Sequence, residues 1–308
     1  LRGEATASLP GKLNGEMARP PYRVIDAHVH IMPWEQVLPG PAALMSDRED
    51  FEQVRAIYRD PTRLIDYMDV CGVEKLVVIN YVSPDVIGFT EEANDFSART
   101  ASAYPQRLLP FGGIDPRRVA DVAAEMDRLL GEPPAGLGLR GIKLHPPHQH
   151  FHVNAYLDDP DLRGLTTVYE KCIQYRVPLM VHTGTSIFSS ARNKYGHPMA
   201  LDDVIVDFPD LQLIIAHGGR PLWMEETFFL LRRSPNVYLD ICGVPPKKLL
   251  DYFPWIERVA EQTMFGSDWP GPGVKDIHRN IEAFYALPIS EEVKKQVLRE
   301  TAEGLFAR

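Results

Sequence analysis

The chain has 308 residues, of which 44% are hydrophobic and 24% are charged, and its formal net charge is −9. This composition is typical of a globular protein with enough length for one large core. No stretch is rich enough in lysine and arginine to follow a phosphate backbone, so no nucleic-acid partner is expected. No apolar run reaches the roughly 18 residues that a membrane-spanning helix needs, so no membrane partner is expected either.

The cysteines and the N-terminal stretch indicate a compartment and a domain boundary. Cys71, Cys172 and Cys242 are odd in number, widely spaced and form no CxxC motif. They are predicted to be buried thiols in a reducing compartment, which indicates a cytoplasmic location. Residues 1–22 are rich in glycine, proline and small polar residues and lack the apolar segment of a secretory signal. We therefore expect a mobile N-terminal extension over 1–22 and a single domain over 23–308.

Short apolar segments and helical patterns alternate along the rest of the chain. Strands are predicted at Arg23–Ala27, Val73–Asn80, Leu108–Asp115, Gly141–His145, Pro178–His182, Leu211–His217, Val237–Ile241 and Thr263–Gly266. Helices are predicted at Pro61–Cys71, Val119–Leu130, Leu162–Tyr175 and Pro221–Arg233, and at Ser290–Phe306 with Ser290 as the N-cap. Strand alternating with helix about eight times predicts an α/β fold, a single-domain (β/α)8 TIM barrel.

Three long connections interrupt this alternation. The segment from His30 to Val73 contains several prolines and is interpreted as a loop over the active-site face. The segment after Lys143 contains four histidines, which are His145, His148, His150 and His152. The last three lie among prolines without a clear strand register, so we expect them to line the mouth of the site. The third connection, Thr183–Pro198, is polar and contains glycine.

Ionisable side chains follow the predicted strands. His28, His30, Lys143, His182, His217 and Asp268 each lie where an apolar run ends. Parallel strands of a barrel deliver such residues to one end, where active sites form. Four imidazoles and a carboxylate at that end predict a divalent-metal site.

Side-chain alternation is compatible with this convergence. His28 and His30 are two residues apart and share a face of their strand, whereas Ile25, Ala27 and Val29 are expected on the face toward the helices. Lys143 and His145 likewise share a face, opposite to Ile142 and Leu144. His182 lies opposite to Leu179 and Val181. Alternation alone does not say which face points into the barrel.

The motifs DAHVHI, GIKLHP, VHTG, AHGG and FGSDWP, in this order, resemble those of the amidohydrolase superfamily, in its amidohydrolase-related branch. The resemblance extends from Val24 to Phe306. That branch holds metal-dependent hydrolases and lactonases as well as non-oxidative decarboxylases. The resemblance implies that His28, His30 and His182 are metal ligands and that His217 binds metal or polarises substrate and water. It implies that Asp268 contacts the metal and is the general base.

Lys143 has three open roles. The resemblance allows it to be carboxylated and to bridge two metals, but it also allows a free cation that pairs with a substrate carboxylate, or a structural ion pair. Further substrate-binding candidates are His145, Trp34, Arg192 and Trp269, with Tyr195 as another residue that can line the pocket. Asp26 is a candidate to orient a ligand histidine. Asp115 and Asp240 are expected either to contribute to the site or to cap the next helix.

The resemblance implies a metal-dependent hydrolase that acts on an amide, lactone or related ester bond of a small molecule. The expected cofactor is one Zn²⁺ or Mn²⁺ per chain, which lowers the pKa of a bound water so that Asp268 can take its proton. The alternative is a metal-dependent decarboxylase or hydratase of a small unsaturated or aromatic acid, and GIKLHPP favours hydrolysis. A ligand-binding barrel without turnover and a metal-free lactonase are the other open hypotheses. A homodimer is expected from the branch.

Overall fold

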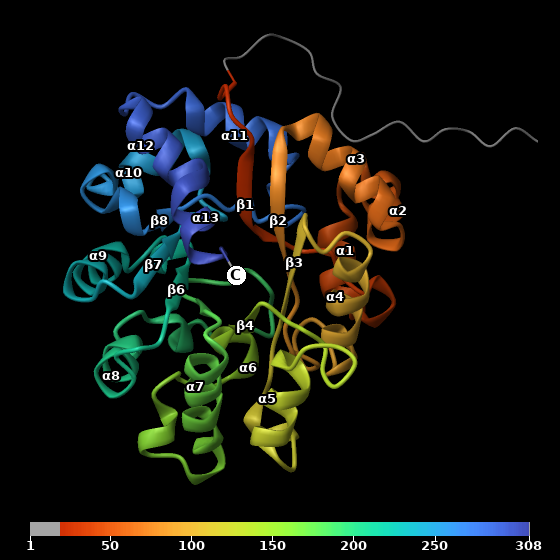
Figure 1. The fold of residues 1–308 in the computed structure, drawn as a ribbon, viewed down its shortest axis with the longest axis vertical. Coiled ribbons are helices and arrows are strands. Elements are labelled where there is room, and N and C mark those ends of the chain that lie inside the picture. Colours follow the sequence, from red (N-terminus) through yellow and green to blue (C-terminus); the bar gives the residue numbers. More distant parts are fainter. Residues whose placement is uncertain (1–18, 308) are drawn as a thin grey trace, which may run out of the picture.

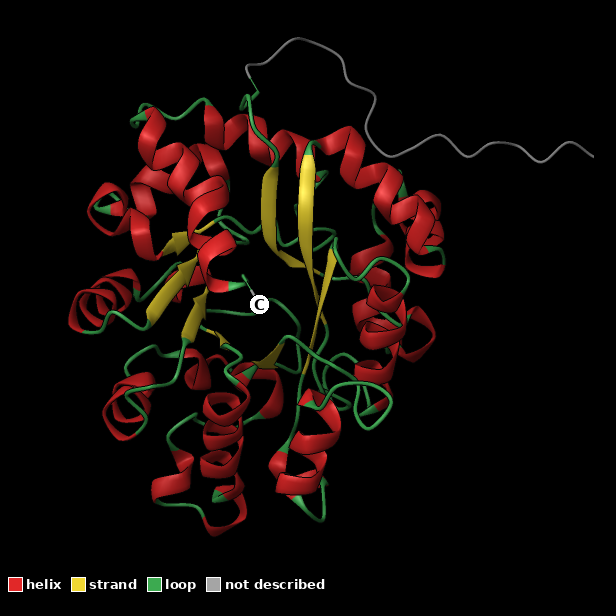
Figure 2. Cartoon of the chain, in the orientation of Figure 1, coloured by secondary structure: helices red, strands yellow, loops and turns green. Residues whose placement is uncertain are grey.

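The computed structural model describes residues 19–307, which form one barrel of eight parallel strands (Figures 1 and 2). The strands are β1 (Val24–Val29), β2 (Val73–Ile79), β3 (Leu108–Gly112), β4 (Gly141–Leu144), β5 (Leu179–His182), β6 (Leu213–Ala216), β7 (Val237–Asp240) and β8 (Thr263–Met264). Each strand pairs with the next one in the chain. All eight predicted strands are thereby confirmed, with ends that differ by a few residues.

The barrel closes between β1 and the segment that follows β8. The backbone N–H of Ala27 donates to the carbonyl of Phe265 at 2.9 Å, and the N–H of Asp268 donates to the carbonyl of His28 at 2.9 Å. The N–H of His30 donates to the carbonyl of Trp269 at 2.8 Å. These bonds place the first-strand histidines directly beside Asp268.

Helices surround the strands on the outside of the ring (Figure 2). They are α1 (Pro39–Ser46), α2 (Phe51–Arg59), α3 (Pro61–Cys71), α4 (Glu92–Ser102), α5 (Val122–Leu130), α6 (Pro146–Gln149), α7 (Gly164–Tyr175), α8 (Ala200–Asp207), α9 (Met224–Arg233), α10 (Leu249–Tyr252), α11 (Ile277–Tyr285), α12 (Glu291–Lys295) and α13 (Thr301–Leu305). The segment His30–Val73, expected to be a loop before its helix, contains α1 and α2 as well. No helix among residues 19–307 is long and apolar enough to span a membrane.

Local signals explain where two of the predicted helices begin and end. The Asp60 side chain accepts a hydrogen bond from the N–H of Thr62, and Gly72 ends α3 in the left-handed conformation with φ 75°. The Ser290 hydroxyl accepts a hydrogen bond from the N–H of Val293 at 3.2 Å, which confirms the predicted N-cap. The predicted helix Ser290–Phe306 is interrupted by a π-helical turn at Gln296–Glu300, which separates α12 from α13.

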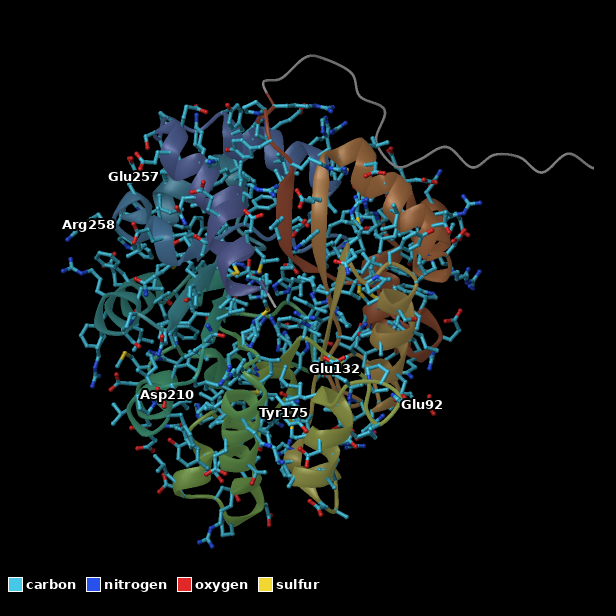
Figure 3. All side chains as sticks on the ribbon, in the orientation of Figure 1. Glu92, Glu132, Tyr175, Asp210, Glu257 and Arg258 are labelled. Atoms are coloured by element: carbon cyan, nitrogen blue, oxygen red, sulfur yellow. The ribbon has the colours of Figure 1, made fainter. Side chains whose placement is uncertain are left out.

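Apolar side chains form two layers, one inside the barrel and one between the strands and the helices. The inner layer consists of Ile25, Ala27, Val77, Ile79, Tyr81, Leu109, Phe111, Met180, Ile214, Ala216, Cys242 and Met264, joined by Ala302, Leu305 and Phe306 near the C-terminus. In Figure 1 the C-terminus accordingly lies over the centre of the ring, and Figure 3 shows side chains filling that space.

The expected facing of β1 was wrong for two residues. Ile25 and Ala27 belong to the inner layer, whereas Val29 packs in the outer layer as expected. The pairing of β1 with β2 shifts register between Asp26 and Val29, which is the signature of a β-bulge. The bulge interrupts the alternation of side chains between the two faces of β1. Ile25 and Ala27 therefore point into the barrel, and so does His28. The predicted boundary between residues 22 and 23 stays a prediction, since residues 1–18 of the expected extension lie outside the described part.

The inward position of the C-terminus predicts a large contribution to stability. The Phe306 ring lies 6.0 Å from the Phe111 ring, edge to face, and is only 7% exposed. Phe306→Ala should lower the free energy of unfolding by about 3 kcal/mol, because it opens a cavity at the closed end of the barrel. Urea denaturation measures this loss. Phe229→Ala, at a ring that is 52% exposed, is the control and should change stability by less than about 0.5 kcal/mol.

Candidate active site

The carboxyl ends of the strands surround one cavity of about 370 Å³. All six residues that the sequence analysis placed at strand ends line it, namely His28, His30, Lys143, His182, His217 and Asp268. His145 lines it too. The barrel therefore brings together residues that are far apart in the chain, such as His28 and Asp268, which are 240 positions apart.

The two histidines at the carboxyl end of β1, His28 within the strand and His30 just after it, present bare ring nitrogens to each other. His28 donates from Nδ1 to Asp240 Oδ2 at 2.6 Å, and His30 donates from Nδ1 to the carbonyl of Ile79 at 3.0 Å. A carboxylate or a carbonyl only accepts, so each ring carries its proton on Nδ1 and a lone pair on Nε2. These two Nε2 atoms lie 3.3 Å apart.

This geometry fits a metal ion. Two nitrogens bound to one tetrahedral zinc at about 2.0–2.1 Å are separated by roughly 3.3–3.4 Å. Asp268 Oδ1 lies 3.4 Å from His30 Nε2 and 3.7 Å from His28 Nε2, so the three atoms outline one face of a coordination shell. Facing lone pairs repel each other, and a cation between them removes that repulsion.

His182 and His217 complete the group. Their rings lie 4.4 Å apart. His182 Nε2 is buried and has no hydrogen-bond partner among residues 19–307. His217 donates from Nδ1 to the carbonyl of Cys242 at 3.0 Å, which leaves its Nε2 free for the cavity. A buried nitrogen without a partner is costly, so a ligand in this cavity is the simplest way to satisfy it.

Burial keeps the imidazoles neutral, which is the form that binds metal. It is the largest cause that lowers the pKa of His28, His182 and His217 well below the usual range. Burial also lowers the pKa of Lys143. For Asp268, burial raises the pKa, but the neighbouring His30, His28 and Arg220 together outweigh it and hold the pKa below its ordinary value.

The backbone is strained at two of these residues. His217 and Asp268 adopt the left-handed conformation, with φ of 66° and 63°. This conformation costs a residue other than glycine about 1–2 kcal/mol, so the surrounding packing must hold it. Gly243, with φ 65°, faces both, and a Cβ there would lie 2.6 Å from Asp268 Oδ2. Because Gly243 has no side chain, the Asp268 carboxylate can occupy this space.

The sequence analysis left the roles of three carboxylates open. In the structure each of them has a different role. Asp240 orients the ring of His28, as described above. Asp26 Oδ1 accepts the backbone N–H groups of His28 and Ser267, so it holds the backbone rather than an imidazole. Asp115 caps the short helix after β3 by accepting from the N–H of Arg117.

Two residues in or beside the site were not predicted to belong to it. Arg220 lines the cavity three residues after His217, and Cys242 Sγ lies 3.0 Å from His28 Nδ1 and 3.1 Å from His217 Nδ1. The only sequence signal that could have placed Cys242 at the site was its position two residues after Asp240. For Arg220 the sequence held no signal beyond its closeness to His217.

The histidines after β4 separate into two groups. His148 is buried and lines the cavity, and its Nδ1 lies 3.0 Å from the hydroxyl of Tyr81. The His145 ring is stacked between those of His148 and His182, at 3.5 and 3.8 Å. His152 instead packs against Tyr195 at 4.8 Å and does not line the cavity.

Three expected substrate-binding residues lie elsewhere, which corrects the sequence analysis. Trp269 is fully buried and packs on Tyr67, with ring centroids 4.9 Å apart, because the chain turns outward after Asp268. Trp34 packs on Phe51 at 4.8 Å, under α2. Arg192 is exposed on the loop after β5. None of the three lines the cavity.

The amidohydrolase family model matches residues 25–308. The chain belongs to the amidohydrolase family. It is therefore an enzyme, and the family match together with the ligand set supports metal-dependent catalysis on a small molecule. A search of curated proteins found no match.

Solved structures share the fold of this amidohydrolase. An uncharacterised TIM-barrel protein from Bordetella bronchiseptica is 24% identical, with a TM-score of 0.71 over 92% of this chain and 98% of that one. A 5-carboxyvanillate decarboxylase from Novosphingobium aromaticivorans, complexed with manganese and 4-hydroxy-3-methoxy-5-nitrobenzoic acid, is 17% identical, with a TM-score of 0.64 over 96% and 100%. A probable 2-pyrone-4,6-dicarboxylic acid hydrolase from Acinetobacter baumannii is 15% identical, with a TM-score of 0.62 over 93% and 100%.

The contact between Asp240 and His28 generates a prediction for metal affinity. Asp240→Asn should weaken zinc binding by about 10- to 100-fold, because the amide no longer fixes the Nδ1 proton of His28. Competition with a chromophoric chelator measures the change. Asp210→Asn, at an exposed carboxylate on the rim of the molecule in Figure 3, is the matched control and should bind zinc like the wild type.

Proposed function

We propose that this amidohydrolase is a metal-dependent hydrolase that cleaves an amide, lactone or related ester bond of a small molecule. The observation that carries the proposal is the facing pair of Nε2 atoms, 3.3 Å apart, with Asp268 beside both. His28, His30, His182 and Asp268 would hold one Zn²⁺ or Mn²⁺. Manganese is supported by the Novosphingobium decarboxylase, whose structure contains it.

The chain's own residues would divide the work of hydrolysis. A bound divalent ion supplies a Lewis acid that lowers the pKa of a water toward ~7. Asp268 accepts the proton of the attacking water and returns it to the leaving group. His217 presents the lone pair of its Nε2 to the cavity, where it would accept a hydrogen bond from the attacking water or serve as a further ligand of the ion.

Lys143 is proposed to remain a free amine. Its side chain is only 1% exposed, and Nζ has no hydrogen-bond partner among the described residues. The structural ion pair considered for it is absent from that part of the chain. Carbon dioxide reacts with the deprotonated form of an amine, so the carboxylated, metal-bridging form of Lys143 is the competing hypothesis and has its own test below.

Decarboxylation of a small unsaturated or aromatic acid is the second candidate. Its support is the 5-carboxyvanillate decarboxylase fold match and the aromatic walls of the cavity, which include Tyr81 and Phe89. In that reaction Asp268 would deliver a proton to the substrate carbon. Hydrolysis is preferred because the Arg220 guanidinium, whose Nη2 lies 4.0 Å from Asp268 Oδ2, favours the ionised carboxylate that accepts a proton.

A homodimer and a cytoplasmic location are also proposed. Phe229 is exposed on α9, where it can contribute to a dimer interface, whereas Phe228 stacks on Trp255 at 4.4 Å within the chain. Light scattering on the purified protein gives the oligomeric state directly.

Metal content and intact mass test the proposed centre. The purified protein should contain about one zinc or manganese per chain, and its gently measured mass should equal that of the sequence, because Lys143 stays uncarboxylated. Two metals with the added mass of one carbon dioxide would replace this proposal with a binuclear hydrolase. Activity without metal, unchanged by chelators, would contradict metal dependence.

Three substitutions separate metal binding from proton transfer. A panel of amides, lactones and esters, with carbon dioxide release followed in parallel on aromatic acids, identifies a substrate. Asp268→Asn should then lower turnover by at least about a hundredfold while the protein keeps part of its metal. His28→Ala and His182→Ala should lose metal and turnover together. Near wild-type turnover in Asp268→Asn would exclude its role as general base, and carbon dioxide release alone would replace hydrolysis with decarboxylation.

A further inference from the structure

A serine, a histidine and a tyrosine form a hydrogen-bonded chain on the wall of the cavity. Ser186 Oγ lies 2.7 Å from His148 Nε2, and Nδ1 of the same ring lies 3.0 Å from the hydroxyl of Tyr81. All three residues line the cavity. None of the three takes part in the hydrolysis proposed above. The cavity therefore holds a second polar group for which the metal centre does not account.

The contacts of this group match those of an activated serine. Such a nucleophile lies within about 2.6–3.2 Å of a base, and a third group orients the base from its other side. His148 Nε2 meets the first condition for Ser186, and the Tyr81 hydroxyl meets the second. This arrangement is recognised by geometry and by the role of each group, whatever the order of the residues in the chain.

The loop after β5 holds Ser186 in a fixed position. The N–H of Ser186 donates to Asn193 Oδ1 at 2.8 Å, and Asn193 Nδ2 donates to the carbonyl of Ser186 at 3.2 Å. The N–H of Phe188 donates to Ser186 Oγ at 3.4 Å. The backbone of the serine is thus held by one amide side chain and its hydroxyl by His148. A nucleophile that is already positioned loses less freedom when it reacts.

The imidazole is fixed as well. His148 is only 2% exposed, and its ring stacks on that of His145 at 3.5 Å and meets that of Phe188 edge to face at 5.5 Å. Burial lowers the pKa of His148 well below its usual range, so the ring is neutral at neutral pH and one nitrogen carries a lone pair. A phenol hydroxyl can accept as well as donate. When Tyr81 accepts from Nδ1–H, the lone pair is on Nε2 and faces Ser186.

The strength of this base determines the class of compound that Ser186 can attack. A buried imidazole with a lowered pKa is a weak base, and a phenol stabilises an imidazolium less than a carboxylate does. The serine is therefore matched to compounds with a good leaving group, such as aryl esters, which need little help from a general acid. The N–H of Ile187, the next residue, makes no hydrogen bond among the described residues and can donate to the oxygen on which charge develops.

We propose that Ser186 is a second nucleophile in this cavity, which takes the acyl group of an activated ester and does so without the metal. The Ser186 oxygen bonds to the carbonyl carbon, and the bond to the aryloxide breaks and leaves its electron pair on that group. The hydroxyl proton passes to His148 Nε2 and from there to the aryloxide. The products are an acylated Ser186 and a phenol.

A stable covalent adduct tests this step without any turnover. Diisopropyl fluorophosphate is the probe, because Ser186 Oγ would bond to phosphorus while fluoride leaves, and the adduct persists. Wild-type protein is treated with the probe once loaded with zinc and once after chelation, and the intact mass and the labelled peptide are then determined. One diisopropylphosphoryl group per chain should appear on Ser186 in both samples, at similar rates.

Three variants each remove one member of the chain. Ser186→Ala should carry no label. His148→Phe keeps a stacked ring but removes the base, and Tyr81→Phe removes only the hydroxyl, so each should slow the labelling of Ser186 by at least about tenfold. Ser189→Ala, at an exposed serine of the same loop outside the cavity, is the matched control and should be labelled like the wild type.

Three results would overturn the inference. The first is a wild type that stays unlabelled or carries the label on another residue, such as Lys143. The second is a His148→Phe or Tyr81→Phe protein that keeps the wild-type melting temperature and whose Ser186 reacts as fast as in the wild type. The third is labelling that disappears on chelation, which would make the serine dependent on the metal. Because the mass of the adduct is measured, a failure of the proposed hydrolysis does not affect the result.

Discussion

The hydrogen bond from His28 Nδ1 to Asp240 Oδ2, 2.6 Å long and completely buried, is the contact on which the site depends. It joins β1 to β7 across the barrel and decides which nitrogen of His28 carries the proton. The matching bond from His30 Nδ1 to the carbonyl of Ile79 does the same for the second ring. Both Nε2 atoms are therefore unprotonated, and their lone pairs face each other. Nothing in the sequence spacing of HxH requires that orientation. The closed ring of strands supplies it, because β7 ends where β1 presents its histidine.

The same ring supports the strain at Asp268. Its left-handed backbone costs about 1–2 kcal/mol, and the residues after it offset that cost. Trp269 is buried completely against Tyr67. Arg48, before α2, donates to the carbonyls of Pro270 and Lys275 at 3.2 and 2.6 Å. The loop after β1 thus holds the loop after β8 in place. This packing behind Asp268 positions its carboxylate beside the histidines.

The sequence predicted the strands and the residues at their ends because both leave local signals. An apolar run such as LQLIIA ends at His217, and in a parallel barrel each such end lies on one face. The facing of Ile25 and Ala27 could not be predicted, since a bulge in β1 depends on its pairing with β2. Trp269 follows a predicted ligand and yet turns away from it. The placement of Arg220 depends on its contacts with Thr185, which is 35 residues away in the chain.

The choice between hydrolysis and decarboxylation depends on the proton of one carboxyl group rather than on the ligand set. Both reactions use the same histidines, so the surroundings of Asp268 carry the distinction. One of its oxygens lies within 3.4 Å of His30, and the other faces Arg220 at 4.0 Å. Of these two neighbours, His30 presents a lone pair, whereas the Arg220 guanidinium carries a positive charge and stabilises the ionised form of Asp268. A substrate group that paired with Arg220 would weaken this stabilisation and raise the pKa of Asp268, which would make it a better acid. The occupant of the Arg220 side of the cavity thereby influences which chemistry Asp268 performs.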